Sequence, residues 1–203
     1  MNGLTIINKP LLCEWIFDIA FLAKLTTPLL KGLPVQPKSH MPSSISTVIL
    51  GIGNPLLSDE GVGVHAIRWL DSNVDANQKR LLNLDFVDGG TIGFALSGLI
   101  GDADQIIIID AAELHSEPGA IQVFTGEGMD HFLGQRQSLA VHEVSLLDVL
   151  SVVLLEDRLP SKRAIIGIQP ASLEWGEAPT EQVAKSIPEA CNAALALAKE
   201  WLQ

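Results

Sequence analysis

The segment Thr47–Gly63, TVILGIGNPLLSDEGVG, constrains the fold of this chain more than any other stretch. Its first residues, Val48–Ile52, are mostly apolar and β-branched, which is typical of a buried parallel strand, and the glycines of GIGN then permit a sharp turn. Asp59 and Glu60 follow, in a cluster suited to opening a helix. They are therefore predicted to lie where a strand ends and a helix begins, which is the edge where open α/β sheets bind their ligands.

The length and composition of the chain favour one main domain. With 203 residues, 47% of them hydrophobic and only 18% charged, the chain can bury a substantial core. A formal net charge of −11 argues against binding to nucleic acid or to an anionic membrane surface, because both partners would be repelled. Cys13 and Cys191 form neither a CxxC motif nor a disulfide framework. We therefore expect the protein to reside in a reducing compartment, the cytoplasm. We also expect it to be a monomer.

Residues 1–46 differ from the rest of the chain. Their apolar side chains fall at helical spacing, but Glu14, Asp18 and Lys24 interrupt the run, so it makes a poor membrane span and a poor signal-peptide core. Prolines and serines then give a linker rich in helix breakers. We predict a dispensable leader and linker over residues 1–46 and the folded domain over residues 47–203.

The remainder of the chain alternates strands with helices. We expect strands at 84–87, 105–109, 120–124 and 163–168 and helices at 63–70, 94–101, 144–154 and 180–202. We expect a loop at 71–80 and another at 126–138, where one helical turn could form. Pro188 is expected to kink or break the terminal helix. This alternation predicts an α/β fold, a three-layer sandwich with a twisted, mostly parallel five-stranded sheet and helices on both faces. The strand at 120–124 is the expected antiparallel member.

Three of the predicted strand ends and helix starts carry an acid or a histidine. Glu60 follows the first strand, Asp110 ends a run of four isoleucines, and His142 stands at the start of a helix. Because the carboxyl ends of parallel strands share one edge, these side chains can converge. A Glu, an Asp and a His form a three-ligand set with an open position, and such ligands suit nickel, zinc, cobalt or manganese.

Each of these residues also has a purely structural interpretation. Asp59 or Glu60 could cap the following helix, which is worth about 1 kcal/mol. His142 could be a polar residue at a helix terminus. Asp110 favours function more strongly, because a carboxylate at the end of a buried strand is costly unless it is paired, bound or solvated. The segment Asp88-Gly89-Gly90 could be only a turn, but it lies at the same edge, and we assign it to substrate binding.

Other chemistries have less support. GIGNPL lacks the third glycine of the dinucleotide-binding GxGxxG motif, and the chain contains no GxxxxGK[ST], HExxH or GxSxG motif. The acids leave an aspartic-protease-like reaction open, in which Asp59, Glu60 or Asp110 activates a water molecule. From the residues alone, the choice between these carboxylates stays open.

Five segments in this order closely resemble the NiFe-hydrogenase maturation endopeptidases. They are GIGNPLLSDEGVG, DGGT at Asp88–Thr91, IIIIDAA at Ile106–Ala112, VHEVSLLDVL at Val141–Leu150 and IIGIQPASLEWG at Ile165–Gly176. The resemblance extends from about Thr47 to Leu202. It implies an endopeptidase that removes a short C-terminal peptide from the precursor of a hydrogenase large subunit after nickel insertion, which lets that subunit mature. It also implies a twisted mixed sheet between helices, in agreement with the fold expected from the residues.

The resemblance further implies roles for individual residues. Glu60, Asp110 and His142 match the family's metal-contacting positions, and the nickel they would meet is the one held by cysteine thiolates of the precursor. The cofactor would then be supplied by the substrate. Hydrolysis would be of aspartic type or metal-assisted, with Asp59, Glu60 and Asp110 all candidates for the base. Two alternatives remain, a module that binds loaded precursor without cutting it and a self-contained metallohydrolase.

Overall fold

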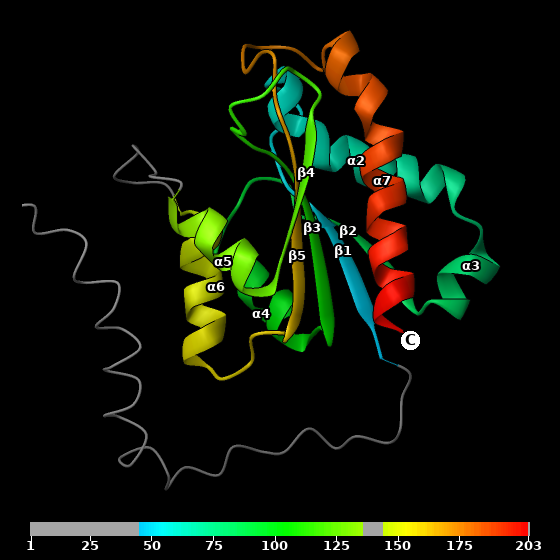
Figure 1. Ribbon diagram of the computed structural model, residues 1–203, viewed down its shortest axis with the longest axis vertical. Helices are drawn as coiled ribbons and strands as arrows, with labels where there is room; N and C mark the ends of the chain where they lie inside the picture. Colours follow the sequence, from blue (N-terminus) through cyan, green and yellow to red (C-terminus); the bar gives the residue numbers. More distant parts are fainter. Residues whose placement is uncertain (1–44, 136–143, 203) are drawn as a thin grey trace, which may run out of the picture. The chain divides into compact units, whose positions relative to one another are not determined.

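A computed structural model of the chain describes residues 45–135 and 144–202 (Figure 1). All the described elements belong to one compact unit, Ser43–Gln203. The predicted leader lies almost entirely outside the described residues, so its dispensability stays a prediction. Within the described ranges no helix combines the length and the apolar character needed to cross a membrane.

A five-stranded sheet forms the centre of this unit. Its strands are β1 (Thr47–Gly51), β2 (Leu84–Asp88), β3 (Gln105–Ala111), β4 (Ile121–Thr125) and β5 (Lys162–Ile168). The spatial order is β2-β1-β3-β5-β4, and every neighbouring pair is parallel except β4 with β5. The predicted fold class and the predicted antiparallel strand are therefore confirmed.

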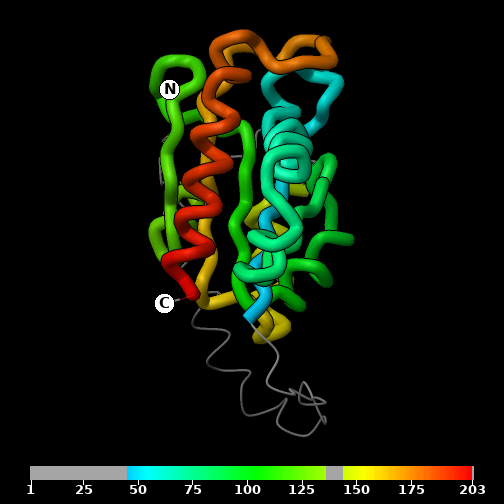
Figure 2. Tube along the Cα trace, turned by 90° about the vertical axis from the view of Figure 1, so that its right-hand side faces the viewer, coloured from blue at the N-terminus to red at the C-terminus, as the bar shows by residue number. Residues whose placement is uncertain are grey.

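Helices cover both faces of this sheet, which explains why β1 and β3 are buried along their whole length. One face packs against α2 (Val62–Asn73) and α7 (Glu181–Trp201), which lie side by side in Figure 2. The other face packs against α4 (Leu96–Asp102), α5 (Gly126–Gln135) and α6 (Leu146–Leu155). The short α3 (Ala76–Leu81) contacts β2, and the 3-10 helix η1 (Ser58–Gly61) leads into α2.

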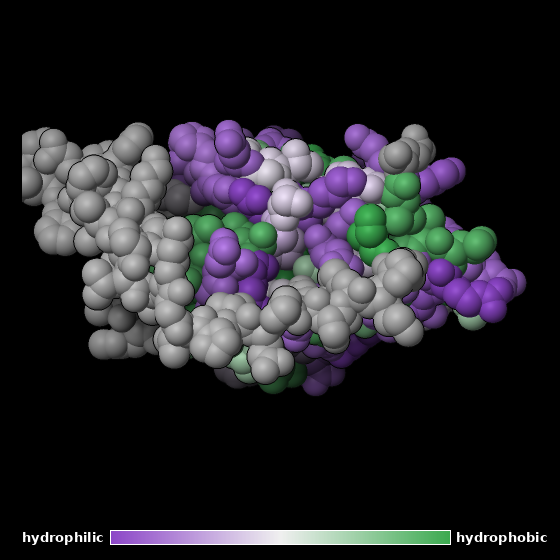
Figure 3. Space-filling view, turned by 90° about the horizontal axis from the view of Figure 1, so that it is seen from below, coloured by the Kyte–Doolittle hydropathy of each residue, from purple (hydrophilic) through white to green (hydrophobic). Residues whose placement is uncertain are grey.

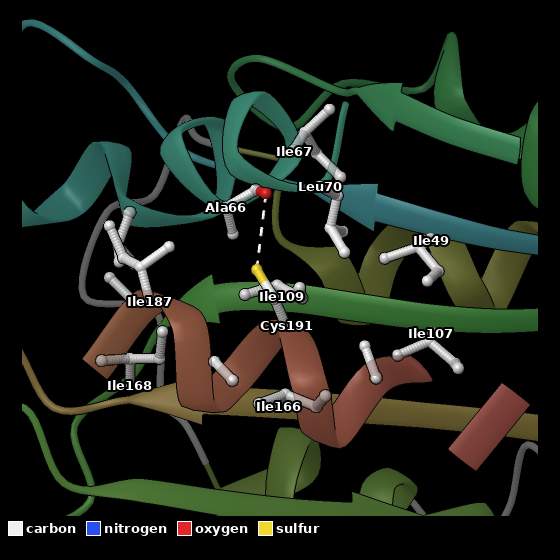
Figure 4. Packing of buried hydrophobic residues seen from close by; sticks show 14 of the residues in the cluster. Ile49, Ala66, Ile67, Leu70, Ile107, Ile109, Ile166, Ile168, Ile187 and Cys191 are labelled. Carbon is white, nitrogen blue, oxygen red and sulfur yellow. Dashed lines mark hydrogen bonds between the residues drawn. The ribbon is translucent and has the colours of Figure 1, made fainter. Parts of the chain in front are cut away.

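Small side chains allow α2 and α7 to pack closely over the sheet. The Sγ atom of Cys191 in α7 donates to the carbonyl oxygen of Ala66 in α2 over 3.5 Å. Figure 4 shows this contact above the isoleucines of the central strands, among them Ile109 and Ile166, and all of these side chains are buried. The α2–α7 pair is therefore a fixed layer of the core.

Two predicted loops contain helices. The polar run 71–80 holds the end of α2 and most of α3, where the Asp75 side chain accepts hydrogen bonds from the N–H groups of Asn77 and Gln78, both at 2.8 Å. The predicted loop at 126–138 contains α5, whose Met129 and Leu133 are four residues apart and buried. The apolar stripe of α5 is short, and α3 buries no residue, so periodicity alone did not distinguish either helix from a loop.

The terminal helix α7 runs without a break through Pro188, so of the two predicted outcomes the break is wrong, while the kink stays a prediction. Val183 and Ile187 are buried before the proline, and Ala190 and Ala194 are buried after it. Burial of these side chains against the sheet and α2 outweighs the helix hydrogen bond that a proline cannot make.

The view from below shows the end of the molecule opposite the strand carboxyl ends. The described side chains visible there include both hydrophilic and hydrophobic groups (Figure 3). The acidic residues singled out from the sequence belong to the other end.

Candidate functional site

Hydrogen bonds hold the segments that follow β1, β2 and β3 at one edge of the sheet. The N–H of Gly53 donates to the carbonyl of Gly90 at 2.8 Å, and the N–H of Gly89 donates to the carbonyl of Gly51 at 2.8 Å. The N–H of Ile52 donates to the carbonyl of Ile109 at 3.0 Å. The carboxyl ends of these three strands therefore lie at one edge, and the convergence of the Glu60, Asp110 and His142 side chains stays a prediction.

Glycines allow the entry to α2 to lie directly on these strand ends. A Cβ atom at Gly63 would lie 2.3 Å from the carbonyl oxygen of Ile109, and one at Gly53 would lie 1.8 Å from that of Glu60. Both separations are far below a van der Waals contact, so only glycine fits. The close approach brings η1 into contact with β3 and sets Glu60 near the strand end that carries Asp110.

The Glu60 side chain is oriented by the turn before it. Its Oε2 atom accepts a hydrogen bond from the backbone N–H of Asn54 at 2.6 Å, and the Asn54 Oδ1 atom accepts from the N–H of Leu56 at 3.1 Å. Glu60 is half-buried. This short charge-assisted hydrogen bond fixes the Oε2 atom and so restricts the orientation of the Glu60 carboxylate.

Asp110 lies near the end of β3 with only 8% of its surface exposed. Ile109, the residue before it, is paired with Gly51 of β1, which is also paired with Asp88 of β2. Asp110 therefore extends one residue beyond that level, at the edge to which Glu60 belongs. The structure brings together the segments that carry these two acids, as predicted.

The segment Asp88-Gly89-Gly90 forms a tight turn. The exposed Asp88 side chain accepts from the N–H of Gly90 at 2.9 Å, and Gly90 adopts a φ of 53°. Gly89 packs so closely on β1 that an added Cβ would lie 2.8 Å from the Leu50 Cδ1 atom. Neither the interpretation of this segment as only a turn nor its assignment to substrate binding is decided by these contacts, and both stay predictions.

The third member of the predicted ligand set, His142, lies outside the described residues. Among residues 45–135 and 144–202, no group of three or more histidine, cysteine, aspartate or glutamate side chains is arranged to hold a metal ion. The roles of Glu60, Asp110 and His142 as metal ligands therefore stay a prediction. Carboxylate oxygens at one sheet edge are suitable donors for a borderline divalent metal.

Asp59 differs sharply from its neighbour Glu60. It is fully buried, and its carboxylate accepts four hydrogen bonds from the segment after β5. The Oδ2 atom accepts from the N–H groups of Ala171 at 2.8 Å and Ser172 at 2.9 Å, and from the Thr180 hydroxyl at 3.0 Å, while Oδ1 accepts from the Thr180 N–H at 2.6 Å. Asp59 therefore fastens η1 to residues 171–180.

The structure contradicts the interpretation that Asp59 or Glu60 caps the helix α2. The N-cap of α2 is Gly61, and no side chain caps that helix by a hydrogen bond. Asp59 accepts its hydrogen bonds from residues 171–180 instead, and Glu60 accepts one from Asn54 in the turn before it. The catalytic assignment of Asp59 stays a prediction, but its geometry is that of a structural anchor.

Sequence reasoning missed the part played by the segment between β5 and α7. The N–H of Ser58 donates to the Gly176 carbonyl at 2.8 Å, and the N–H of Gly176 donates to the Leu56 carbonyl at 2.9 Å. This segment therefore lies against the turn that carries Glu60, as Figures 1 and 2 show at the same end of the molecule. Two sequence signals fall on this segment: the absence of helix or strand periodicity after Pro170, and its inclusion in IIGIQPASLEWG, one of the five segments that carry the family resemblance.

The fold and the acidic strand ends define an α/β protein with a candidate site at the carboxyl edge of its sheet. The model of the hydrogenase maturation protease family matches residues 64–197. The chain belongs to the hydrogenase maturation protease family.

Relatives and solved structures agree with this assignment. The hydrogenase expression/formation protein HupD of Rhizobium leguminosarum bv. viciae is 30% identical over 178 residues, which are 87% of this chain and 82% of that protein. The hydrogenase 2 maturation protease of Escherichia coli is 32% identical over 75% of this chain and 90% of its own length. The solved structure of the hydrogenase maturating endopeptidase HybD from E. coli superposes with a TM-score of 0.67 at 29% identity, covering 77% of this chain and 93% of that one.

Proposed function

We propose that this chain is an endopeptidase that removes the C-terminal peptide from the precursor of a hydrogenase large subunit after nickel has been inserted. The observation that carries the proposal is the contact between η1, which carries Glu60, and β3, which carries Asp110, in a hydrogenase maturation protease fold. Two acids at the carboxyl edge of a parallel sheet give hydrolysis both a base and a ligand set.

The nickel belongs to the substrate in this proposal. Glu60, Asp110 and His142 would complete the coordination of a nickel ion that the precursor presents on cysteine thiolates. Oxygen and imidazole donors are suitable for nickel. The peptidase would then bind loaded precursor more tightly than empty precursor, because only the loaded form offers the open coordination positions.

The four hydrogen bonds to the Asp59 carboxylate argue that the general base is Glu60 or Asp110 rather than Asp59. A base must reach the water molecule whose proton it takes, and both oxygens of the fully buried Asp59 already accept hydrogen bonds from the chain. The reaction adds water to the carbonyl carbon of the scissile peptide bond and breaks its C–N bond. The proton taken from the water passes to the leaving amine.

We also propose a cytoplasmic location and a monomeric state. The location rests on the cysteines, since Cys191 is a buried free thiol and the sequence offers no disulfide framework. Gel filtration with light scattering measures the oligomeric state directly.

The test is a cleavage assay on purified large-subunit precursor, with and without nickel, followed by mass spectrometry of the released fragment. Wild type is expected to release the fragment only from the loaded precursor. Glu60→Gln, Asp110→Asn and His142→Ala are each expected to lose at least about 100-fold in kcat/KM while keeping the fold. Asp85→Asn, an exposed acid on β2, is the matched control and is expected to retain activity.

Three results would count against the proposal in different ways. Release from empty precursor would remove nickel as the recognition element. Binding without release would favour the module that recognises precursor without cutting it. Unfolding of all three site variants, measured by circular dichroism, would assign those residues a structural role.

A further inference from the structure

Two segments beside Glu60 carry large apolar side chains that are exposed to solvent. Leu56 is 49% exposed, Leu173 is 55% exposed and Trp175 is 83% exposed, and we call these three residues the apolar rim. Their segments, 54–60 and 169–180, lie side by side at the carboxyl end of the sheet (Figures 1 and 2). Neighbouring exposed apolar groups of this size indicate an interaction surface rather than chance exposure.

The backbone beneath the apolar rim is fixed. Leu57 and Gly176 form a parallel bridge, the Ser58 hydroxyl donates to the Glu174 carbonyl at 3.0 Å, and Asp59 accepts four hydrogen bonds from residues 171–180. A partner that binds here would not have to order the loop first. Preorganisation of this kind lowers the entropic cost of association.

The charges around the apolar rim define the chemistry of its partner. Segments 54–60 and 169–180 contain four acids and no lysine or arginine, and the acids are Asp59, Glu60, Glu174 and Glu177. Glu174 and Glu177 are exposed. A partner complementary to this surface would present apolar side chains flanked by basic groups. Protein interfaces commonly combine an apolar centre with surrounding polar groups whose charges are opposite on the two partners.

We propose that the apolar rim docks the large-subunit precursor next to its scissile segment. This inference rests on the proposed function, because a protein substrate whose peptide bond reaches Glu60 must also cover Leu56, four residues earlier in the same turn. Glu60 and the apolar rim therefore belong to two segments that are hydrogen-bonded to each other at the same end of the sheet. Trp175 is the expected anchor, since tryptophan in the centre of an interface often carries much of the binding energy.

The experiment measures precursor binding separately from cleavage. Fluorescence anisotropy of dye-labelled, nickel-loaded precursor gives Kd, and the cleavage assay gives kcat and KM. Trp175→Ala is expected to raise both Kd and KM at least about tenfold and to leave kcat within about twofold. Leu155→Ala, which truncates a 74% exposed leucine at the end of α6, is the control and is expected to change neither constant. Higher salt is expected to weaken binding by wild type.

The two proposals fail in distinguishable ways. Unchanged Kd and KM in Trp175→Ala, with normal cleavage by wild type, would overturn the docking surface and leave the peptidase intact. Binding that depends on Trp175 but is not followed by cleavage would support the docking surface and would overturn the proposed peptidase activity. A wild-type dimer that Trp175→Ala turns into a monomer, with unchanged Kd, would assign the apolar rim to a second copy and overturn the proposal. An unchanged Kd with a clear loss of unfolding free energy would mean that Trp175 packs within its own chain, which also overturns it.

Discussion

Asp59 and Thr180, which are 121 residues apart in the chain, are joined by two hydrogen bonds. The carboxylate accepts from the Thr180 N–H at 2.6 Å and from its hydroxyl at 3.0 Å. Thr180 is the N-cap residue of α7, yet its side chain does not cap that helix. The hydroxyl serves instead to tie the start of α7 to the turn that carries Glu60.

Asp59→Asn is expected to lower the free energy of unfolding by about 3 kcal/mol, because the new amide NH₂ group would face donors that a carboxylate now satisfies. Urea denaturation followed by circular dichroism measures the change. Thr180→Val removes one of the four bonds and is expected to cost about 1 kcal/mol. Equal stability of Asp59→Asn and wild type would show that Asp59 is not an anchor.

Gly63→Ala is expected to destabilise the domain by about 3 kcal/mol, since its Cβ would lie 2.3 Å from the carbonyl oxygens of both Ile109 and Ile52. Gly93→Ala is the matched control, because a Cβ there meets nothing within 4 Å, and its effect is expected to stay within about 0.5 kcal/mol. The melting temperatures of the two variants, measured by thermal unfolding, test this expectation. Similar melting temperatures would refute the close-approach account of the junction.

His65 is expected to make stability depend on pH. Burial, reinforced by the charge of Arg68, lowers the pKa of His65, and its Nε2 atom has no hydrogen-bond partner within the described structure. The unfolded chain takes up a proton near the ordinary pKa of about 6.5, whereas the folded chain does so only at lower pH. The contribution of neutral His65 to the free energy of unfolding is therefore fully present above about pH 6.5. It is lost as the pH falls toward the lower pKa that His65 has in the folded chain.

Urea denaturation at pH values between 5 and 8 measures this effect, with His65→Gln as the comparison. Wild type is expected to lose stability relative to His65→Gln as the pH falls. Parallel curves for wild type and His65→Gln would contradict the assignment.

The Cys191 thiol is expected to be unreactive in the folded protein. Burial raises its pKa to about 12, so the reactive thiolate is scarce at pH 8, and the side chain is also inaccessible. In a Cys13→Ser background, labelling by Ellman's reagent is expected to be at least about 100-fold slower than in guanidinium-unfolded protein. Rapid labelling of the native state would mean that the α2–α7 layer opens readily.

The main strands and the location of the candidate site could be predicted from the sequence. Ile106–Ile109 is apolar without alternation, which a strand buried on both faces requires, and Asp110 directly ends that run. Short polar helices such as α3 could not be predicted in this way, because α3 buries no side chain and so leaves no periodic signal.

The sequence by itself determined the alternation of strands and helices and the presence of acids at strand ends, because hydrophobic periodicity and chain breakers are local properties. Only the tertiary structure decided that Asp59 and Glu60, adjacent in sequence, have different surroundings. Asp59 meets donors more than 100 residues away, whereas Glu60 is held by Asn54, six residues away in its own turn. A hydrogen bond between distant segments depends on how the sheet brings them together, and no local pattern encodes that.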